Sequence, residues 1–218
     1  MRTIAFVTQK GGSGKSTIAS SLAVAAQEMK EKAGVVDMDP QGSMMNWLKT
    51  RGSDDIEVVA SGGARLAAVL ARLKGRGCTL AIIDTPGAEG PASAAAMEIA
   101  DLNIIPSRPS MFDLRASANT RAALEAVGGE FIFLLNQCPP IQQTERVRDG
   151  VETLEEMGGL ISPLILLRVD YQEAARHGVG VTELNPKGAA AEEMRALWVS
   201  IRSRLARIKP RTAGPRAA

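Results

Sequence analysis

The stretch that decides the fold is Lys10-Gly11-Gly12-Ser13-Gly14-Lys15-Ser16-Thr17. The apolar run Thr3–Thr8 precedes it, and a helical pattern, Ser16–Lys32, follows it. Glycines here let successive backbone N–H groups turn toward an anion, and the start of a helix adds a partial positive charge. Lys15 offers a cation to phosphate oxygens, and the Ser16 hydroxyl can ligate Mg²⁺. Between a strand and a helix, this composition predicts a loop that binds the phosphates of a nucleotide.

Outward from this loop, short apolar runs alternate with helical patterns along the chain. Strands are expected at Thr3–Thr8, Ala33–Asp37, Ile56–Ala60, Thr79–Asp84, Leu102–Pro106, Phe131–Asn136 and Ser162–Leu167. Helices are expected at Ser16–Lys32, Ser43–Arg51, Ala64–Gly75, Pro91–Ala100, Leu114–Val127, Thr144–Met157, Tyr171–His177 and Ala189–Ile208. Several of the strand runs are apolar nearly throughout, as in parallel strands covered on both faces. The alternation predicts a single α/β domain over residues 1–208, with a mostly parallel, twisted sheet of about seven strands flanked by helices.

The composition is that of an ordinary globular domain. The chain has 218 residues, of which 45% are hydrophobic and 23% charged, which excludes disorder and fibrous repeats. Its apolar runs are too short for a membrane span, and its first residues lack the pattern of a signal peptide. We therefore expect a soluble, cytoplasmic protein. The two cysteines, Cys78 and Cys138, are too few for a disulfide framework or a four-cysteine zinc site, and we expect both to pack in the interior.

The charge is uneven, although the net charge is only +2. Residues 191–218 carry two glutamates against seven cations: Arg195, Arg202, Arg204, Arg207, Lys209, Arg211 and Arg216. A basic end indicates either a polyanionic partner or a solvated helix face, and charge alone leaves both open. Residues 209–218 contain proline and glycine, and we expect them to form a disordered basic tail.

The phosphate loop departs from the common GxxxxGK[ST] pattern, because Gln9 replaces its first glycine and Lys10 adds a second lysine. In this it resembles the deviant Walker-A ATPases of the ParA/MinD family. The resemblance extends over most of the chain and includes Asp37-Met38-Asp39-Pro40-Gln41, which matches D-x-D-P-Q, and Ile82–Gly87, which matches the family's second acidic strand end. The segment 101–106, Pro109, Asn136, Arg168, Tyr171, Gly178 and Glu183 also fit. The chain is most similar to small ParA partition proteins that lack an N-terminal helix-turn-helix domain.

The resemblance implies ATP or ADP and Mg²⁺ as cofactors. It implies that Lys10 acts in trans across a homodimer, that Lys15 holds the phosphates and that Asp39 positions the attacking water. The remaining phosphate-binding residues would be Gly11, Gly12, Ser13, Gly14, Ser16 and Thr17, and Mg²⁺ would be held by Ser16, Asp84 and Asp39, partly through water. The residues themselves agree, because Asp39 and Asp84 each follow an apolar strand, where α/β sheets bind ligands.

Three further residues have open roles. The amide of Asn136 suits an adenine edge or an ordinary strand-end cap. Pro106 forms a wall near the base or only bounds a loop. Asp37 supports the turn at Asp39 or hydrogen-bonds a loop.

The C-terminal helix carries an apolar stripe at three- and four-residue steps, formed by Met194, Leu197, Trp198, Ile201, Leu205 and Ile208. We expect this stripe to dock on the core. The exposed cations that remain would be Arg202, Arg204, Arg207, Lys209 and Arg211, and the resemblance implies that they bind DNA without sequence preference in an ATP-bound dimer. The alternative is a helix lying on a membrane, as in the MinD branch.

The expected function is that of a ParA-type ATPase. It would dimerise on ATP, associate with the nucleoid and hydrolyse ATP when stimulated by a ParB-like or other adaptor protein, without stable insertion into a membrane. The cargo would be plasmid or chromosomal DNA or a protein assembly. The alternative is a membrane-associated spatial regulator similar to MinD.

Overall fold

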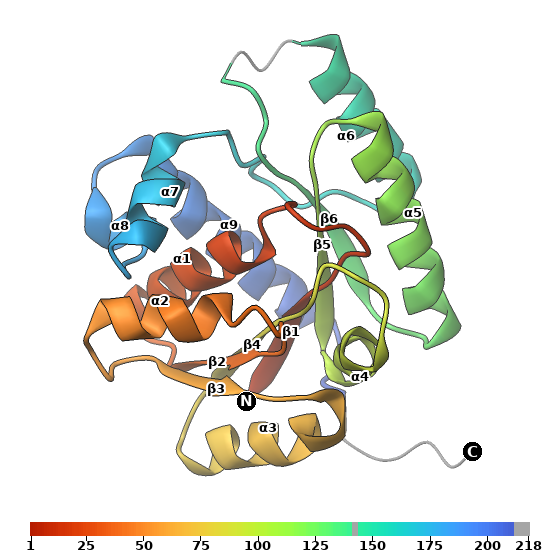
Figure 1. Cartoon of the computed structure of the whole chain (residues 1–218). Helices are drawn as coiled ribbons and strands as arrows, with labels where there is room; N and C mark the ends of the chain where they lie inside the picture. Colours follow the sequence, from red (N-terminus) through yellow and green to blue (C-terminus); the bar gives the residue numbers. More distant parts are fainter. Residues whose placement is uncertain (141–143, 212–218) are drawn as a thin grey trace.

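The computed structural model describes residues 1–140 and 144–211. In this part of the chain, six parallel strands form one sheet in the order β3-β2-β4-β1-β5-β6 (Figure 1). Their bounds are β1 Arg2–Phe6, β2 Ala33–Asp37, β3 Glu57–Ala60, β4 Leu80–Asp84, β5 Leu102–Ser107 and β6 Phe131–Leu135. Because β1 lies between β4 and β5, the phosphate loop that follows β1 emerges at the middle of the sheet's carboxyl edge.

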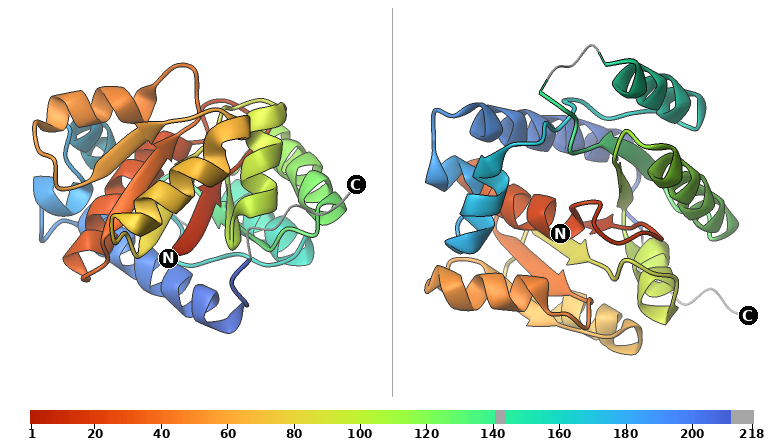
Figure 2. Two further views of the ribbon diagram at one scale, coloured as in Figure 1. Left: turned by 90° about the horizontal axis from the view of Figure 1, so that it is seen from below. Right: turned by 45° about the horizontal axis from the view of Figure 1, so that its top comes forward.

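Helices cover both faces of the sheet (Figure 2). One face is covered by α1 (Lys15–Glu28), α2 (Ser43–Arg51), α7 (Val169–Arg176), α8 (Val181–Leu184) and α9 (Ala189–Arg207). The other is covered by α3 (Leu66–Gly75), α4 (Pro91–Ile99), α5 (Met111–Ala126) and α6 (Glu145–Glu156), with a 3₁₀ turn, η1 (Gly63–Arg65), before α3. The predicted α/β class with a parallel sheet between helices is confirmed.

The apolar character of the strands follows from this layering. Along β1, Ile4 and Phe6 belong to the core beneath α1 and α9, whereas the intervening Ala5 belongs to the core beneath α3 to α6. Successive side chains of a strand point to opposite faces, so a strand covered on both faces is apolar at every position. This is the pattern from which the parallel sheet was predicted.

The prediction of a seventh strand at Ser162–Leu167 is wrong, because the structure describes this segment and shows no strand there. This segment runs beside β6 but pairs with it only at isolated bridges, Phe133 with Leu160 and Cys138 with Leu166. Pro163 lies between these bridges and has no backbone N–H to donate, so a continuous ladder cannot form there. Within residues 1–140 and 144–211 the sheet therefore has six strands, not about seven.

The predicted helix at Leu114–Val127 begins three residues earlier, at Met111. Ser110 caps it, because its side chain accepts a hydrogen bond from the backbone N–H of Asp113. The short helix α8 and the turn η1 were not predicted.

Most of the predicted apolar stripe is buried in the core: Met194, Leu197, Trp198, Ile201 and Leu205. Its last member, Ile208, follows α9 and packs against this core while only partly buried. Within the described ranges, no helix is long and apolar enough to cross a membrane.

Arg211 was expected to be an exposed cation in a disordered tail, and this is wrong. Its guanidinium donates hydrogen bonds to four backbone carbonyls, those of Met97, Glu98, Val127 and Gly128. These carbonyls lie at the C-terminal ends of α4 and α5, where helix dipoles favour a cation. The rest of the predicted tail, residues 212–218, lies outside the described residues.

Candidate functional site

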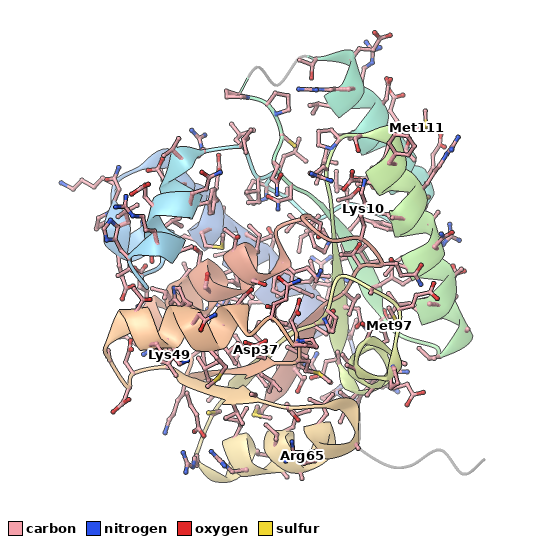
Figure 3. The ribbon with its side chains drawn as sticks, viewed as in Figure 1. Lys10, Asp37, Lys49, Arg65, Met97 and Met111 are labelled. Carbon is pink, nitrogen blue, oxygen red and sulfur yellow. The ribbon has the colours of Figure 1, made fainter. Side chains whose placement is uncertain are left out.

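The phosphate loop joins β1 to α1 at the carboxyl edge of the sheet, and Lys10 lies on it opposite the start of α5 (Figure 3). Gly14 precedes α1 with a φ of 91°, a left-handed conformation that favours glycine. A Cβ added to Gly14 would stand 2.4 Å from Nδ2 of Asn136. Both the backbone conformation and the neighbouring side chain therefore require glycine at this position.

The residues that follow β6 brace the loop. Nδ2 of Asn136 donates a hydrogen bond to the carbonyl of Ser13 at 2.7 Å, and its Oδ1 accepts one from the backbone N–H of Gln137. Nε2 of Gln137 donates to the carbonyl of Gly12 at 3.1 Å. Asn136 is thus more than a strand-end cap. One amide hydrogen and one lone pair remain for its expected role at an adenine edge, which stays a prediction.

Lys15 and Asp84 form the buried interior of the site. Asp84 is fully buried at the end of β4, and Lys15 is 7% exposed at the start of α1. Burial raises the pKa of Asp84 to about 7, although the nearby Ser16 hydroxyl and the Lys15 ammonium act to lower it. Burial also lowers the pKa of Lys15, against the opposite influence of Asp84 and Asp39. Each charged group therefore depends on the other, or on a ligand, to remain ionised.

The donors beside Asp84 fit Mg²⁺. Both carboxylate oxygens of Asp84 are buried, and neither has a hydrogen-bond partner within the described part of the chain. Oxygen ligands are those that Mg²⁺ prefers, and in nucleotide sites it is held by one or two protein groups together with phosphates and water. Residues 1–140 and 144–211 contain no group of three or more His, Cys, Asp or Glu side chains that could hold a metal by themselves. Ser16 and Asp84 would therefore hold the ion jointly with the nucleotide.

Asp37 is a brace within this site. Its Oδ1 accepts the backbone N–H of Asp39 at 3.1 Å, and its Oδ2 accepts that of Met45, in the first turn of α2, at 3.0 Å. Asp37 therefore both supports the turn at Asp39 and ties down the loop before α2, so the two roles left open by the sequence hold together. Asp39 is partly exposed, and its Oδ1 accepts the backbone N–H of Gln41 at 2.9 Å. One oxygen of Asp39 is left to face a water or a ligand.

Lys10 is held by a residue that the sequence reasoning missed. Its Nζ lies 2.8 Å from Oδ2 of Asp113, whose side chain is only 3% exposed. Arg108 also binds this carboxylate, with Nε 2.9 Å from Oδ1. The pattern Ser110-x-x-Asp113 is a helix-start signal and could have placed Asp113 in the first turn of α5. No sequence pattern indicated that this turn would meet Lys10.

A cavity of about 120 Å³ lies beside the loop. Its wall includes Thr17, Asn136, Leu167, Arg168 and Tyr171. The guanidinium of Arg168 is fixed by two hydrogen bonds to Oε1 of Glu193, at 2.9 and 2.7 Å, so its position is set by α9.

Pro106 is buried within β5, where it pairs with Leu134 of β6, and its expected place near the base stays a prediction. The apolar side chains that line the cavity are Ile18, Leu166 and Leu167, of which Leu167 is 51% exposed.

The residues that were expected to bind DNA lie on α9 and just beyond it. They are distant in sequence from the phosphate loop and belong to a different helix from the one that follows it. Arg202, Arg207 and Lys209 are exposed. Arg204 is partly buried, and its nearest acidic group in the described residues is Glu130, at 3.8 Å. Arg204 and Arg207 line a hollow of about 440 Å³ together with Ser200 and Ser203. The arrangement offers cations and hydroxyl donors to an anion.

Comparison with known proteins gives the same family throughout. The model of the CobQ/CobB/MinD/ParA nucleotide binding domain matches residues 4–184. The chain is 32% identical over 198 residues to the maintenance of carboxysome distribution protein A of Gloeobacter kilaueensis, which covers 88% of this chain and 89% of the relative. It is 30% identical over 147 residues to the chromosome partitioning protein ParA of Caulobacter vibrioides, covering 64% of this chain and 48% of that protein.

Solved structures share the fold. Apo McdA from Cyanothece superposes with a TM-score of 0.73 at 18% identity, covering 94% of this chain and 99% of the other. The septum site-determining protein MinD of Pyrococcus horikoshii, in complex with Mg-ADP, superposes with a TM-score of 0.72 at 20% identity, covering 92% and 95%.

Proposed function

Because the chain belongs to the CobQ/CobB/MinD/ParA family of nucleotide-binding domains, whose ParA/MinD members are P-loop ATPases, we propose that it is an ATPase that forms a dimer on ATP. The dimer binds DNA without sequence preference, and hydrolysis stimulated by an adaptor protein releases it. Repeated binding and release moves or spaces a cargo, which is plasmid or chromosomal DNA or a protein assembly.

The observation that carries this proposal is the meeting of two lysines and two acids at one edge of the sheet. Lys15 and Asp84 are buried at the base of the phosphate loop, and Asp39 and Lys10 lie at its rim. Phosphoryl transfer needs little covalent help from a protein and depends on positioning and on offsetting negative charge. Lys15 holds the phosphates, and Asp39 orients the attacking water. Lys10 crosses to the partner's nucleotide in the way of an arginine finger, so turnover needs two chains.

The burial of the α9 stripe supports DNA as the polyanion. A helix that lies on a membrane inserts its apolar face among the lipids. The apolar face of α9 is not free to insert into lipid, because Leu197, Trp198 and Ile201 pack in the core. The exposed Arg202, Arg207 and Lys209 are left to contact phosphates. A membrane-associated regulator similar to MinD is the alternative.

The relatives support a protein assembly as cargo. The protein named for the maintenance of carboxysome distribution aligns with 88% of this chain, whereas the Caulobacter partition protein aligns with 64%. An assembly spaced along the nucleoid and a DNA molecule segregated along it need the same ATPase, and only the adaptor differs.

The test measures binding to two surfaces in parallel, each with ATP, with ADP and without nucleotide. A gel shift of plain duplex DNA should appear only with ATP and disappear in Arg202→Ala/Arg207→Ala. Sedimentation with anionic lipid vesicles should show no ATP-dependent binding. ATP-dependent binding to vesicles but not to DNA would replace this proposal by the MinD-like alternative.

A further inference from the structure

Lys10 is bound within its own chain. Its ammonium makes an ion pair with Oδ2 of Asp113 at 2.8 Å and also lies 5.7 Å from the centroid of the Phe112 ring. The Lys10 side chain is 31% exposed, so one side of it faces solvent while its charge is directed at α5. Phe112 is itself 72% exposed, so the pair lies at the surface of the molecule.

Asp113 does not depend on Lys10 alone. Nε of Arg108 donates to its Oδ1 at 2.9 Å, and Nη2 of Arg108 donates to its Oδ2 at 3.3 Å. The Ser110 hydroxyl donates to the same Oδ2. These donors, with Lys10, hold the pKa of Asp113 below its usual range despite burial. If Lys10 leaves, the buried carboxylate of Asp113 keeps Arg108 as its partner. The departure of Lys10 therefore does not leave an unpaired buried charge.

The proposed reaction requires Lys10 to reach the phosphates of a second chain. A Lys10 side chain whose ammonium is held 2.8 Å from Asp113 is directed at its own α5, so it has to leave Asp113 to extend to those phosphates. We propose that Asp113 is a positioning residue that keeps Lys10 on its own chain until a second nucleotide-bound copy offers phosphate oxygens in exchange. This inference rests on the proposed ATP-dependent dimer and adds to it the step that limits its formation.

The exchange explains how nucleotide content would control pairing. ATP presents a γ-phosphate to compete with Asp113 for Lys10, and ADP does not. After hydrolysis and loss of phosphate, Lys10 returns to Asp113, and the contact that joined the chains is lost. Arg108 keeps Asp113 charged and oriented during the interval.

The experiment measures the monomer–dimer equilibrium by sedimentation while the concentration of a non-hydrolysable ATP analogue is increased in the presence of Mg²⁺. Asp113→Asn should reach half-dimerisation at an analogue concentration about three- to tenfold lower than the unsubstituted chain, because two ion pairs are no longer broken per dimer. Arg108→Gln should raise the analogue concentration needed for half-dimerisation, because Lys10 then becomes the main partner of Asp113. Ser110→Ala is the matched control, since it removes the helix cap and a hydrogen bond from an uncharged donor to Asp113 and leaves the ion pair.

A second measurement needs no dimer. In nucleotide-free protein, the rate at which an amine-reactive reagent labels Lys10, followed by mass spectrometry, should rise severalfold in Asp113→Asn and fall in Arg108→Gln. Unchanged labelling in both variants, or dimerisation unaltered by both, would overturn the inference while leaving the proposed function intact. If the unsubstituted chain does not dimerise with the analogue at all, the proposed function itself fails.

Discussion

The side chain of Asn136, the residue that follows β6, donates a hydrogen bond of 2.7 Å to the carbonyl of Ser13 in the phosphate loop. These two residues are far apart in the sequence, and the contact is buried. Asn136→Ala leaves this carbonyl without its partner and leaves space against Gly14. We expect the affinity for ATP to fall about tenfold, since an unmade buried hydrogen bond costs about 1–3 kcal/mol. Titration with a fluorescent ATP analogue measures it.

The neighbouring Gln137 offers a matched control. Its side chain also donates to the loop, at Gly12, but this hydrogen bond is exposed. Gln137→Ala should therefore weaken ATP binding by no more than about twofold, since water replaces an exposed partner. Equal losses in the two variants would show that Asn136 does not brace the loop more than its neighbour.

Gly87 lies against the phosphate loop. A Cβ added there would stand 2.8 Å from Cα of Gly11, a backbone atom that cannot move aside without displacing the loop. Gly87→Ala should weaken ATP binding at least about tenfold, as overpacking of this kind costs about 1–3 kcal/mol. Gly90→Ala is the control, because nothing lies within 4 Å of a Cβ there and its φ of 163° is open to any residue. The proposal of close contact fails if both variants bind ATP normally.

Asp84 should make the stability of the nucleotide-free protein fall with rising pH. Its pKa in the folded protein is about 7, above the value of about 4 expected in the unfolded chain. Between these two pH values the folded state holds a proton that the unfolded state has released, so the contribution of this group to stability declines from pH 4 to pH 7 and stays low above it. Asp84→Asn should remove the decline and raise the free energy of unfolding at pH 8 on the order of 4 kcal/mol.

Thermal unfolding of both proteins between pH 5 and pH 8, without Mg²⁺, checks this. The melting temperature of Asp84→Asn should exceed that of the parent at pH 8, and the gap should narrow toward pH 5. A gap that widened as the pH fell would contradict the burial argument. ATP turnover of the variant should be lost at every pH.

Substitutions at Arg211 and Lys209 should affect different properties, the first the stability of the fold and the second the binding of DNA. Arg211 caps α4 and α5, whereas the Lys209 side chain is exposed and makes no hydrogen bond or ion pair within residues 1–140 and 144–211. Arg211→Ala should lower the melting temperature by about 3–6 °C, which corresponds to about 1–2 kcal/mol in a chain of this size. Lys209→Ala should leave the melting temperature unchanged and weaken the ATP-dependent DNA gel shift. The reverse result would place the DNA contact at Arg211.

Most of the sheet could be predicted from the sequence, because strands buried on both faces have an apolar run between turn residues. Each of the strands β1 to β6 coincides with a predicted run to within one or two residues at either end. The segment 162–167 has the same apolar character, and only Pro163, which cannot donate to a ladder, distinguishes it from a strand. The exposed or short elements, α8 and η1, bury too little to leave a periodic pattern.

The candidate site was predictable where its chemistry is local. The phosphate loop and the acids at the ends of β2 and β4 are adjacent to their strands, so the sequence places them. Asp113, Arg108 and the bracing contact of Asn136 were missed or misassigned because they depend on which distant segments the fold brings together. Arg211 was assigned to a tail because its partners are backbone carbonyls, which no side-chain pattern reveals.

The central claim is that ATP joins two chains through Lys10. The most direct measurement is the sedimentation of Asp39→Ala, in which turnover is blocked, in saturating ATP and Mg²⁺, beside the same variant with Lys10→Ala added. The account predicts a dimer for Asp39→Ala and a monomer for the double variant, with both monomeric in ADP. A monomer of Asp39→Ala in ATP, or a dimer that persists without Lys10, would contradict it.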